Sequence, residues 1–324
     1  MAKRFVSIWF PHLATDWFVI TQPQLRKKAF VLQGTSHGRM IITAASILAQ
    51  SQGVQPGMTL ADARAIFPSL HALDDKPGLN DQLLKRIAGW CIRFTPIAAP
   101  NWPDGILLDA SGCSHLWGGE EIYIQDITKR LTARGYTIRM AIADTIGAAW
   151  AIARFGKEGA VIPKNVQVDA LLNLPPQALR VDPETIIRLH KLGLRKIADF
   201  ISMPHSVLRR HFNTLIINRL KQALGEEEEL VQPIYPLKLY VERLPCLEPI
   251  VTLTGIEIAL QQLLQKLCSR MRKDGKGFRS AYFSCYRVDT GVQGIEIGTS
   301  RATHNEEHLF HLFSLKLSTL QPDA

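Results

Sequence analysis

The sequence has few cysteines and no closely spaced cysteine pair. It contains five cysteines, and none of them forms a CxxC motif. Disulfide frameworks show an even number of cysteines, and thiolate zinc sites show short, regular cysteine spacings. The composition therefore argues against both, and it predicts free, mostly buried thiols in a reducing compartment.

Long apolar runs are absent as well. A helix that crosses a bilayer needs about 20 consecutive apolar residues, and no run in the sequence approaches that length. The first residues, MAKRFVSIWF, lead directly into a strand-like segment without a signal-peptide cleavage pattern. The sequence also lacks internal repeats and low-complexity tracts. We expect a cytoplasmic protein that makes no contact with a membrane.

What is present is a globular composition with an excess of basic residues. Hydrophobic residues make up 46% of the chain and charged residues 21%. The 38 Lys and Arg outnumber the 29 Asp and Glu, which gives a formal charge of +9. A chain of 324 residues predicts two or three domains at about 100–200 residues each. The positive charge favours polyanionic partners such as nucleic acid, although charge alone does not establish one.

The first half of the chain mixes strand-like and helical segments. Apolar, β-prone runs predict strands at 5–10, 30–32, 40–44, 105–109 and 137–143. Helical patterns lie at 13–22, 45–52, 81–94, 120–134 and 146–155. A further short helix is expected between an N-cap at Thr59 and a stop at Pro68. This order predicts an α/β or α+β core over residues 1–160.

Two changes of pattern divide the rest of the chain. Residues 161–170 look like a linker, and 169–223 show helical spacing without a strand. The acidic run 226–229 is expected to be a solvated helix end or linker, and Pro233 and Pro236 mark a second boundary. The remainder predicts a strand at 239–244, a helix at 255–272, strands at 279–288 and 294–299, and a helix at 308–317. Without a further strand, this last module is expected to be truncated.

Several phrases follow one another in the order of a known family. The stretch Thr43–Met58, TAASILAQSQGVQPGM, resembles the fingers motif of the Y-family (UmuC/DinB-like) DNA polymerases, in which Tyr-Glu-Ala-Arg precedes Gly-Val and Gly-Met. The phrase at 192–199 fits the thumb of that family, and those at 244–250, 283–289 and 298–301 resemble its ImuB-type branch.

This resemblance covers nearly the whole chain. It implies an α+β multidomain protein with palm and fingers at 1–162, the fingers lying at about 20–75. A helical thumb with a degenerate helix-hairpin-helix would follow at 163–235, and a truncated little-finger-like domain at 237–324.

The resemblance also locates the positions that would hold catalytic metal. Active members hold two magnesium ions with one Asp from the first strand and an Asp-Glu pair from a later strand. These positions fall on Trp9 and on Asp104-Gly105, and an indole cannot ligate magnesium. Asp104 then remains as a single candidate, or it is only a turn residue after Pro103. Asp109 is an alternative ligand if the register is shifted.

The residues that would grip a triphosphate are also replaced. The resemblance places Ile47 and Gln50 at the Tyr and Arg of the fingers motif, and Trp150 at the catalytic Lys. Cations at such positions stabilise the charge that develops in phosphoryl transfer. We expect Trp9 and Trp150 to fill the vacated space, or simply to pack in the core. Asp16 is expected to be a solvated helix residue.

Basic side chains are the candidates for DNA binding. In the family, hairpin glycines in the thumb bring backbone N–H groups to phosphate, but those positions hold Arg180 and Asp182 here. Side-chain cations are therefore expected to contribute more. The loop 272–277 is either a backbone contact or a solvated loop. The candidates are Arg180, Arg188, Arg209 and Arg210 in the thumb, and Arg272, Lys273, Lys276, Arg279, Arg287 and Arg301 in the last module.

These observations predict a non-catalytic DNA-binding scaffold for DNA damage repair and translesion synthesis (SOS mutagenesis), without a cofactor. One alternative is an active translesion polymerase with displaced ligands, which would use magnesium. Another is an interaction protein that never touches DNA. The resemblance implies three partners: the β sliding clamp, a RecA-like ImuA protein and a C-family error-prone polymerase. No Gln-x-x-Leu-Phe-like clamp peptide precedes Ala324, so either the chain is truncated or clamp docking is absent.

Overall fold

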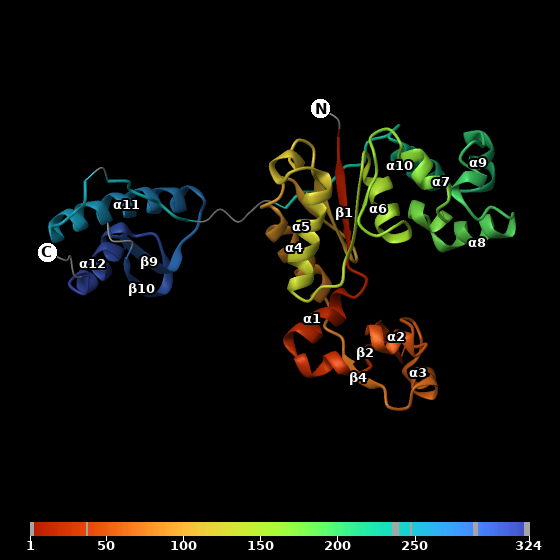
Figure 1. Ribbon diagram of the computed structural model, residues 1–324. Coiled ribbons are helices and arrows are strands. Elements are labelled where there is room, and N and C mark those ends of the chain that lie inside the picture. The colour runs from red at the N-terminus through yellow and green to blue at the C-terminus, as the bar shows by residue number, and fades with distance from the viewer. Residues whose placement is uncertain (1–2, 37, 235–239, 247, 288–290, 321–324) are drawn as a thin grey trace. The chain divides into compact units, whose positions relative to one another are not determined.

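The computed structural model describes residues 3–36, 38–234, 240–246, 248–287 and 291–320. The chain forms two compact units, Met1–Pro236 and Leu237–Ala324, and both combine helices with strands (Figure 1). The predicted α+β class is therefore confirmed. In the part of the chain that the structure describes, no helix is both long and apolar enough to cross a membrane.

The first unit is built on a five-stranded sheet with the order β5-β6-β1-β7-β8, called here the main sheet. The central strand β1 (Phe5–Trp9) pairs antiparallel with β6 (Gly105–Asp109) and with β7 (Arg139–Ala143). β5 (Ala98–Asn101) is antiparallel to β6, and β8 (Ala160–Val161) is parallel to β7. A strand with a neighbour on each side and helices on both faces is expected to be mostly apolar, and Phe5–Trp9 fits this with one buried serine, Ser7.

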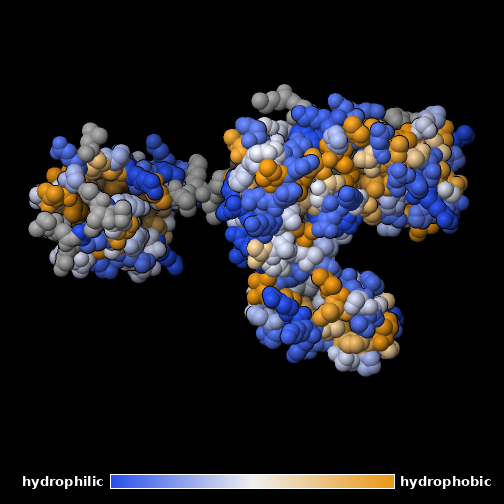
Figure 2. All heavy atoms as spheres, in the orientation of Figure 1, coloured by the Kyte–Doolittle hydropathy of each residue, from blue (hydrophilic) through white to orange (hydrophobic). Residues whose placement is uncertain are grey.

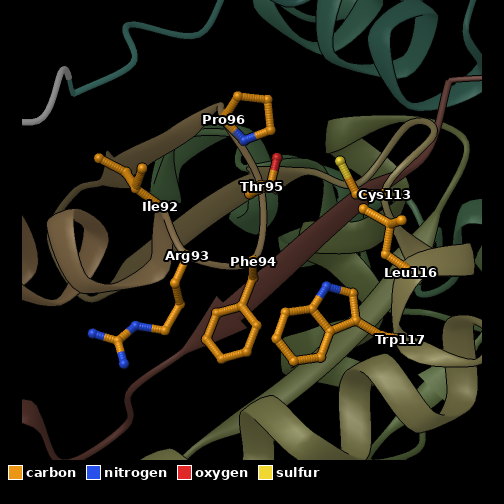
Figure 3. A pocket seen from close by; sticks show the side chains of 8 residues that line it. All are labelled: Ile92, Arg93, Phe94, Thr95, Pro96, Cys113, Leu116 and Trp117. Carbon is orange, nitrogen blue, oxygen red and sulfur yellow. The ribbon is translucent and has the colours of Figure 1, made fainter. Parts of the chain in front are cut away.

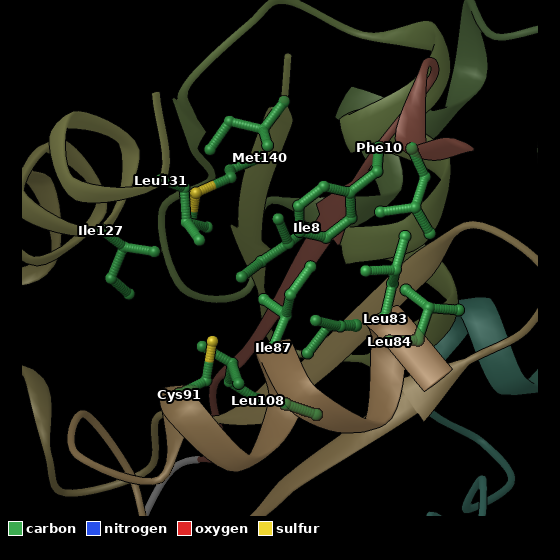
Figure 4. Close-up of a cluster of buried hydrophobic side chains, with 14 of the residues drawn as sticks. Ile8, Phe10, Leu83, Leu84, Ile87, Cys91, Leu108, Ile127, Leu131 and Met140 are labelled. Carbon is green, nitrogen blue, oxygen red and sulfur yellow. The ribbon is translucent and has the colours of Figure 1, made fainter. Parts of the chain in front are cut away.

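Helices cover both faces of the main sheet. α1 (Leu13–Thr21), α4 (Leu79–Cys91) and α5 (Glu120–Ala133) share one hydrophobic cluster with β1, β6 and β7. Figure 4 shows side chains of this cluster pointing toward one another from the sheet and the helices, including Ile8, Phe10, Leu83, Leu84, Ile87, Ile127, Leu131 and Met140. α6 (Ile146–Phe155) packs in a second cluster with Ala141 and Ala143 of β7.

A smaller sheet follows α1 and the 3₁₀ turn η1 (Pro23–Lys27) in the chain. β2 (Phe30–Ser36) lies between β3 (Arg39–Ala45), which is antiparallel, and β4 (His71–Asp74), which is parallel.

Two short helices accompany this small sheet, α2 (Ile47–Ser51) and α3 (Leu60–Ile66). The predicted N-cap is confirmed, since the Thr59 hydroxyl accepts from Asp62 N. Figure 2 shows apolar residues exposed on the lobe that carries these elements.

A helical module completes the first unit. It contains α7 (Gln167–Leu172), α8 (Pro183–Lys191), α9 (His205–His211) and α10 (Thr214–Leu224). α10 packs directly on α6: a β-carbon at Gly147 would lie 2.9 Å from the Cα atom of Ala223. The hydroxyl of Thr145 donates to the Ala223 carbonyl at 2.9 Å. Only glycine permits this backbone approach.

The second unit consists of α11 (Leu253–Lys273), β9 (Phe278–Tyr286), β10 (Val292–Thr303) and α12 (Glu306–Leu317). β9 and β10 form an antiparallel hairpin, and both helices pack on it through a shared cluster.

The strand predicted at 239–244 is wrong for its described part, because residues 240–244 form no strand. Their side chains bind α11 and the residue after it instead. The Tyr240 hydroxyl donates to Asp274 at 2.8 Å, and Arg270 donates to Glu242 at 3.1 Å. Leu239 lies outside the described residues.

Candidate functional site

The main sheet brings Trp9 and Gly105 together. They are paired residues of β1 and β6, and Asp104 immediately precedes β6. Asp109 pairs with Phe5 at the opposite end of the same two strands. Four residues of a strand span about 13 Å. The register therefore sets Asp104 beside Trp9 and keeps Asp109 far from it.

Both carboxylate oxygens of Asp104 are engaged. The indole Nε1 of Trp9 donates to Oδ2 at 2.8 Å, and Nη2 of Arg154 donates to Oδ1 at 2.6 Å. The Arg154 side chain is 7% exposed and that of Asp104 is 34% exposed. Asp104 is therefore more than a turn residue: it joins β1, β6 and α6 through a charge-assisted bond.

The space next to Asp104 is filled. A β-carbon at Gly105 would lie 3.1 Å from Nη2 of Arg154, 3.1 Å from the Ile8 carbonyl and 3.2 Å from the Asn101 carbonyl. Two of these atoms are backbone atoms that cannot move aside easily. A carboxylate side chain at position 105 would meet the guanidinium of Arg154, which lies where a Glu side chain would begin.

Arg154 also organises the two tryptophans. Its guanidinium carbon lies 4.1 Å from the ring centroid of Trp150 and 5.6 Å from that of Trp9. Burial lowers the pKa of Arg154, and the carboxylate of Asp104 opposes that effect. Sequence reasoning missed Arg154. The available signal was its position four residues after Trp150 on α6, which places both on one helix face.

These groups do not suit a magnesium ion. Magnesium requires oxygen ligands in near-octahedral geometry and usually keeps several waters. Here one carboxylate is bonded to an indole N–H, and a guanidinium lies 2.6 Å from its other oxygen. Within the described ranges, no group of three or more His, Cys, Asp or Glu residues is arranged to hold a metal ion.

The two candidates on α2 have no phosphate-binding chemistry. Ile47 is 53% exposed and lines a recess of about 140 Å³ between α1, η1 and α2. The Gln50 side-chain amide donates to the Ala45 carbonyl at 3.2 Å, so it is used by the backbone beside it. Neither residue carries a charge or a phenol.

Asp16 lines the same recess, and the prediction that it is solvated was wrong. It is 9% exposed, and its Oδ2 accepts from the backbone N–H of Thr137 at 2.6 Å. Burial raises the pKa of Asp16 to about 6, although the bond from Thr137 opposes the shift. The chain just before β7 covers this face of α1, which the helical pattern alone did not reveal.

Arg180 of the helical module forms an internal ion pair. Its Nη1 and Nη2 donate to the two carboxylate oxygens of Glu229 at 2.5 and 2.7 Å, and its side chain is 13% exposed. Arg219 lies 3.5 Å from the same carboxylate. Glu229 was expected to be solvated, and its structural role was missed. The structure thus shows Arg180 inside the module, not as an open surface cation.

The backbone at Arg180 keeps a conformation that favours glycine, with φ at 55°. Asp182 is the N-cap of α8 and accepts from Thr185 N at 2.8 Å. Hydrogen bonds from Thr185 and Asn213 lower the pKa of Asp182 to about 2. Arg180 and Asp182, at the expected glycine positions of the helix-hairpin-helix, therefore stabilise the local backbone of the helical module.

The other candidate cations of the helical module lie at its surface. Arg188 is paired with Glu184 across one turn of α8 at 2.8 Å, with its side chain 58% exposed. Arg209 and Arg210 are exposed in the last turn of α9. An ion pair as exposed as that of Arg188 contributes little to stability, so this arginine can exchange Glu184 for another anion.

In the C-terminal unit, most candidate cations gather at one end of the hairpin. Arg272 and Lys273 lie in the last turn of α11. Three more exposed cations lie nearby: Lys276 between α11 and β9, Arg279 near the start of β9, and Arg301 near the end of β10. Arg287 follows Tyr286 at the other end of β9. The sequence placed these residues in one module, and the structure separates Arg287 from the rest.

An apolar recess of about 510 Å³ lies at the end of the main-sheet strands opposite to Trp9 (Figure 3). It is formed by the chain before β5 and the chain after β6, and Leu116 on its rim is 73% exposed. Figure 3 shows the rings of Phe94 and Trp117 side by side in it, with Arg93 at the margin. No pattern in the sequence predicted this recess.

Comparison with known proteins identifies the family. Residues 8–154 match the model of the impB/mucB/samB family. Protein ImuB of Caulobacter vibrioides is 34% identical over 270 residues, which are 83% of this chain and 59% of that protein. Residues 8–154 therefore carry a domain of this family, and the chain is similar to ImuB-type relatives of the Y-family DNA polymerases over most of its length. The resemblance stated from the sequence is thus confirmed, and the chain spans about 59% of the length of that curated relative.

More distant relatives agree with this assignment. DNA polymerase IV of Dehalococcoides mccartyi is 23% identical over 282 residues, covering 83% of this chain and 71% of that protein. The structure of DinB from Sulfolobus solfataricus matches with a TM-score of 0.60 at 16% identity, covering 98% of this chain and 93% of that one. The insertion ternary complex of Dbh DNA polymerase gives 0.60 at 17% identity, with coverage of 98% and 93%. The structural likenesses show a shared fold.

Proposed function

We propose that the chain binds DNA as a scaffold in damage repair and translesion synthesis and does not itself transfer nucleotides. The observation that carries this proposal is the set of contacts that Trp9 and Arg154 make with Asp104. In it, an indole and a guanidinium take both oxygens of the one acid retained from the predicted metal-binding set. The kinship with protein ImuB and with DNA polymerases supports DNA as the ligand.

The physical case against nucleotidyl transfer rests on charge. Two-metal catalysis needs carboxylates that hold cations against the attacking and leaving oxygens. Removing a single preorganised electrostatic donor already slows an enzyme by about 10²–10³. Here Gly105 and Trp9 stand at carboxylate positions, while Ile47, Gln50 and Trp150 stand at positions for phosphate-binding groups. Substitution of two of the three carboxylates and of the three phosphate-binding groups removes most of the electrostatic basis of the reaction.

DNA binding would depend on phosphate contacts. The formal charge of +9 and the exposed cations of α9 and of the C-terminal hairpin suit a polyanion. Such binding is tolerant of sequence and falls steeply as salt rises. The assignment of residues 1–162, 163–235 and 237–324 to palm with fingers, thumb and little finger belongs to this proposal. So does assembly with a β sliding clamp, an ImuA-like protein and a C-family polymerase.

Two assays on one preparation test the proposal. Fluorescence anisotropy with a primer–template should show binding that weakens linearly in log K against log salt. Primer extension with magnesium and all four deoxynucleotides should yield no product. Template-directed extension that disappears in Asp104→Asn would overturn the non-catalytic assignment. A lack of binding even at low salt would overturn the DNA assignment and favour a pure interaction protein.

A further inference from the structure

The apolar recess of Figure 3 is the centre of a wider apolar surface on the first unit. Leu116 on its rim lies in the 3₁₀ turn η2 (Ser114–Trp117) and is 73% exposed. Ile97, at the start of β5, is 39% exposed, and Ile122 of α5 is 54% exposed. Ile122 lies close to the turn, since a β-carbon at Gly118 would be 3.1 Å from its Cδ1. Exposed apolar side chains that gather around a hollow mark a binding surface, whereas scattered ones do not.

Three stacked rings, called here the aromatic row, support the recess from below. The ring centroids of Phe94 and Trp117 lie 5.0 Å apart, and those of Trp90 and Phe94 lie 5.2 Å apart. Phe94 is only 3% exposed, so the core holds the middle ring of the row in place. A hollow that is already formed needs little ordering when a ligand enters it. Tryptophan is also among the residues that contribute most to binding at protein interfaces.

Three arginines border the aromatic row. The guanidinium carbons of Arg93 and Arg134 lie 4.6 and 4.1 Å from the ring centroid of Trp90, and both side chains are exposed. That of Arg130 lies 5.9 Å from the next ring of the row. Arg130 donates to Asp126 at 2.8 Å and keeps 47% of its side chain exposed. With three cations and one acid, this group of side chains presents positive charge beside the apolar recess.

The neighbouring edge strand is poorly suited to pairing with a partner. β5 is the edge strand on this side of the main sheet. Its Ala98 carbonyl already accepts from the N–H of Ile234 at 2.8 Å, and Pro100 has no N–H to donate. Strand addition requires a free row of backbone donors and acceptors. A partner on this surface is therefore held by its side chains, with an apolar group in the recess and charged groups beside the arginines.

We propose that this surface docks an acidic segment of a partner protein. One large apolar side chain of the segment enters the recess beside Leu116, and its carboxylates face Arg93, Arg130 and Arg134. A basic segment is repelled by these arginines, and a neutral one leaves them without anionic partners. A DNA duplex offers negative charge but no apolar side chain for the recess. The recess lies at the strand ends opposite to Trp9, so the inference assigns a ligand to a surface that the proposed function does not use.

The test first selects peptides that use this surface. A phage library of random peptides of about 12 residues, enough for three helical turns, is depleted on the Leu116→Asp variant and then selected on the wild-type full chain. The selected peptides should be rich in Asp and Glu and should carry a Trp, Phe or Leu. Selection of basic or neutral peptides, or of none, would overturn the inference.

Anisotropy titrations with one labelled selected peptide then compare the variants. Leu116→Asp and Arg134→Glu should each weaken binding by about tenfold or more, because they place negative charge at the apolar rim and at the cationic border. Ile187→Asp, at a 55% exposed position of α8, and Lys157→Glu, at another exposed position, are the matched controls. Both should bind within about twofold of the wild type, since surface changes away from an interface are nearly neutral.

Two further measurements separate the other possible occupants. All of the variants should melt within about 3 °C of the wild type, so that loss of binding does not report unfolding. Sedimentation equilibrium should show a monomer; a wild-type dimer that Leu116→Asp dissociates would make a second copy the occupant and overturn the inference. Duplex DNA should not displace the selected peptide. Displacement by the duplex, or equal weakening by the control variants, would also overturn it.

Discussion

Nη2 of Arg154 lies 2.6 Å from Oδ1 of Asp104, and this contact joins the C-terminal half of α6 to the residue that immediately precedes β6. In the register that the resemblance to the Y-family implies, the pair lies at the position of the metal-binding acids. A fixed internal cation there neutralises the single carboxylate that remains. The ion pair therefore balances the charge of this carboxylate within the fold and occupies its Oδ1 atom.

Trp9→Ala should destabilise the protein without affecting any polymerase activity. The substitution removes a large ring and the donor to Asp104, and Trp→Ala substitutions in cores cost about 3–5 kcal/mol. Partial exposure of Trp9 places the expected loss at about 2–4 kcal/mol. Denaturant titration measures it. Trp9→Phe keeps most of the packing and should lose only about 1 kcal/mol with the hydrogen bond. An unchanged unfolding midpoint for Trp9→Ala would contradict the role assigned to the indole.

Gly105→Ala should destabilise the protein by about 1–3 kcal/mol, because the new methyl group would press on the Ile8 and Asn101 carbonyls. Thermal unfolding checks this. Gly89→Ala is the matched control, since it lies in α4 and a β-carbon there meets nothing within 4 Å. Alanine is the better helix former, so this variant should gain about 0.5–1 kcal/mol. Equal melting temperatures for Gly105→Ala and Gly89→Ala would show that a β-carbon at position 105 meets no obstruction.

Asp16→Asn should stabilise the protein at neutral pH and remove part of its pH dependence. The folded pKa of Asp16 is about 6, above its ordinary value of 3.8. A raised pKa in the folded state gives stability that is complete below about pH 4 and is lost as pH rises through about 6. At about 1.4 kcal/mol for each pH unit, this difference corresponds to about 3 kcal/mol.

Unfolding free energies measured from pH 4 to pH 8 test this effect. The advantage of Asp16→Asn should grow between pH 4 and pH 6 and then stay constant. Asp81→Asn, at an exposed position, is the control and should show no such growth. Parallel curves for the wild type and Asp16→Asn would show that the carboxyl group is not buried as described.

Glu229→Gln should tighten DNA binding at low salt. The substitution removes the carboxylate that engages Arg180 and Arg219, and one additional available phosphate contact corresponds to a few-fold gain in affinity. Glu227→Gln makes the same charge change at an exposed position and is the matched control. Anisotropy titrations should show a gain for Glu229→Gln beyond that of Glu227→Gln. Equal affinities would mean that Arg180 stays out of reach of DNA.

The sequence predicted the elements whose signals are local. β6 and α6 have the predicted bounds, because an apolar strand and a capped helix are encoded by neighbouring residues. β4 and β5 were not predicted, since each has four residues, and β5 contains a proline. The strand predicted at 239–244 is wrong for residues 240–244, where Tyr240 and Glu242 bind Asp274 and Arg270 instead.

The candidate site was predictable only in part. The resemblance placed Trp9 and Gly105 at related positions, and the strand register shows that they pair. Arg154 and Glu229 have partners 50 and 49 residues away in the chain, and a single sequence gives no signal for such contacts. Burial of Asp16 depends on Thr137, which is 121 residues away. Charge and sequence motifs thus predict which residues are candidates for the site, while the contacts of those residues depend on the tertiary fold.

The approach of α10 to α6 at Gly147 has a mechanical consequence. The two backbones are in contact here without side chains between them, which restricts rotation of one helix against the other. The Thr145 hydroxyl forms a hydrogen bond to Ala223 at the same contact. We therefore expect the helical module to keep a fixed orientation relative to α6 and the main sheet at this junction. If the chain binds DNA as proposed, we expect selection among DNA shapes to come from fit to this fixed orientation, and not from closure around the ligand.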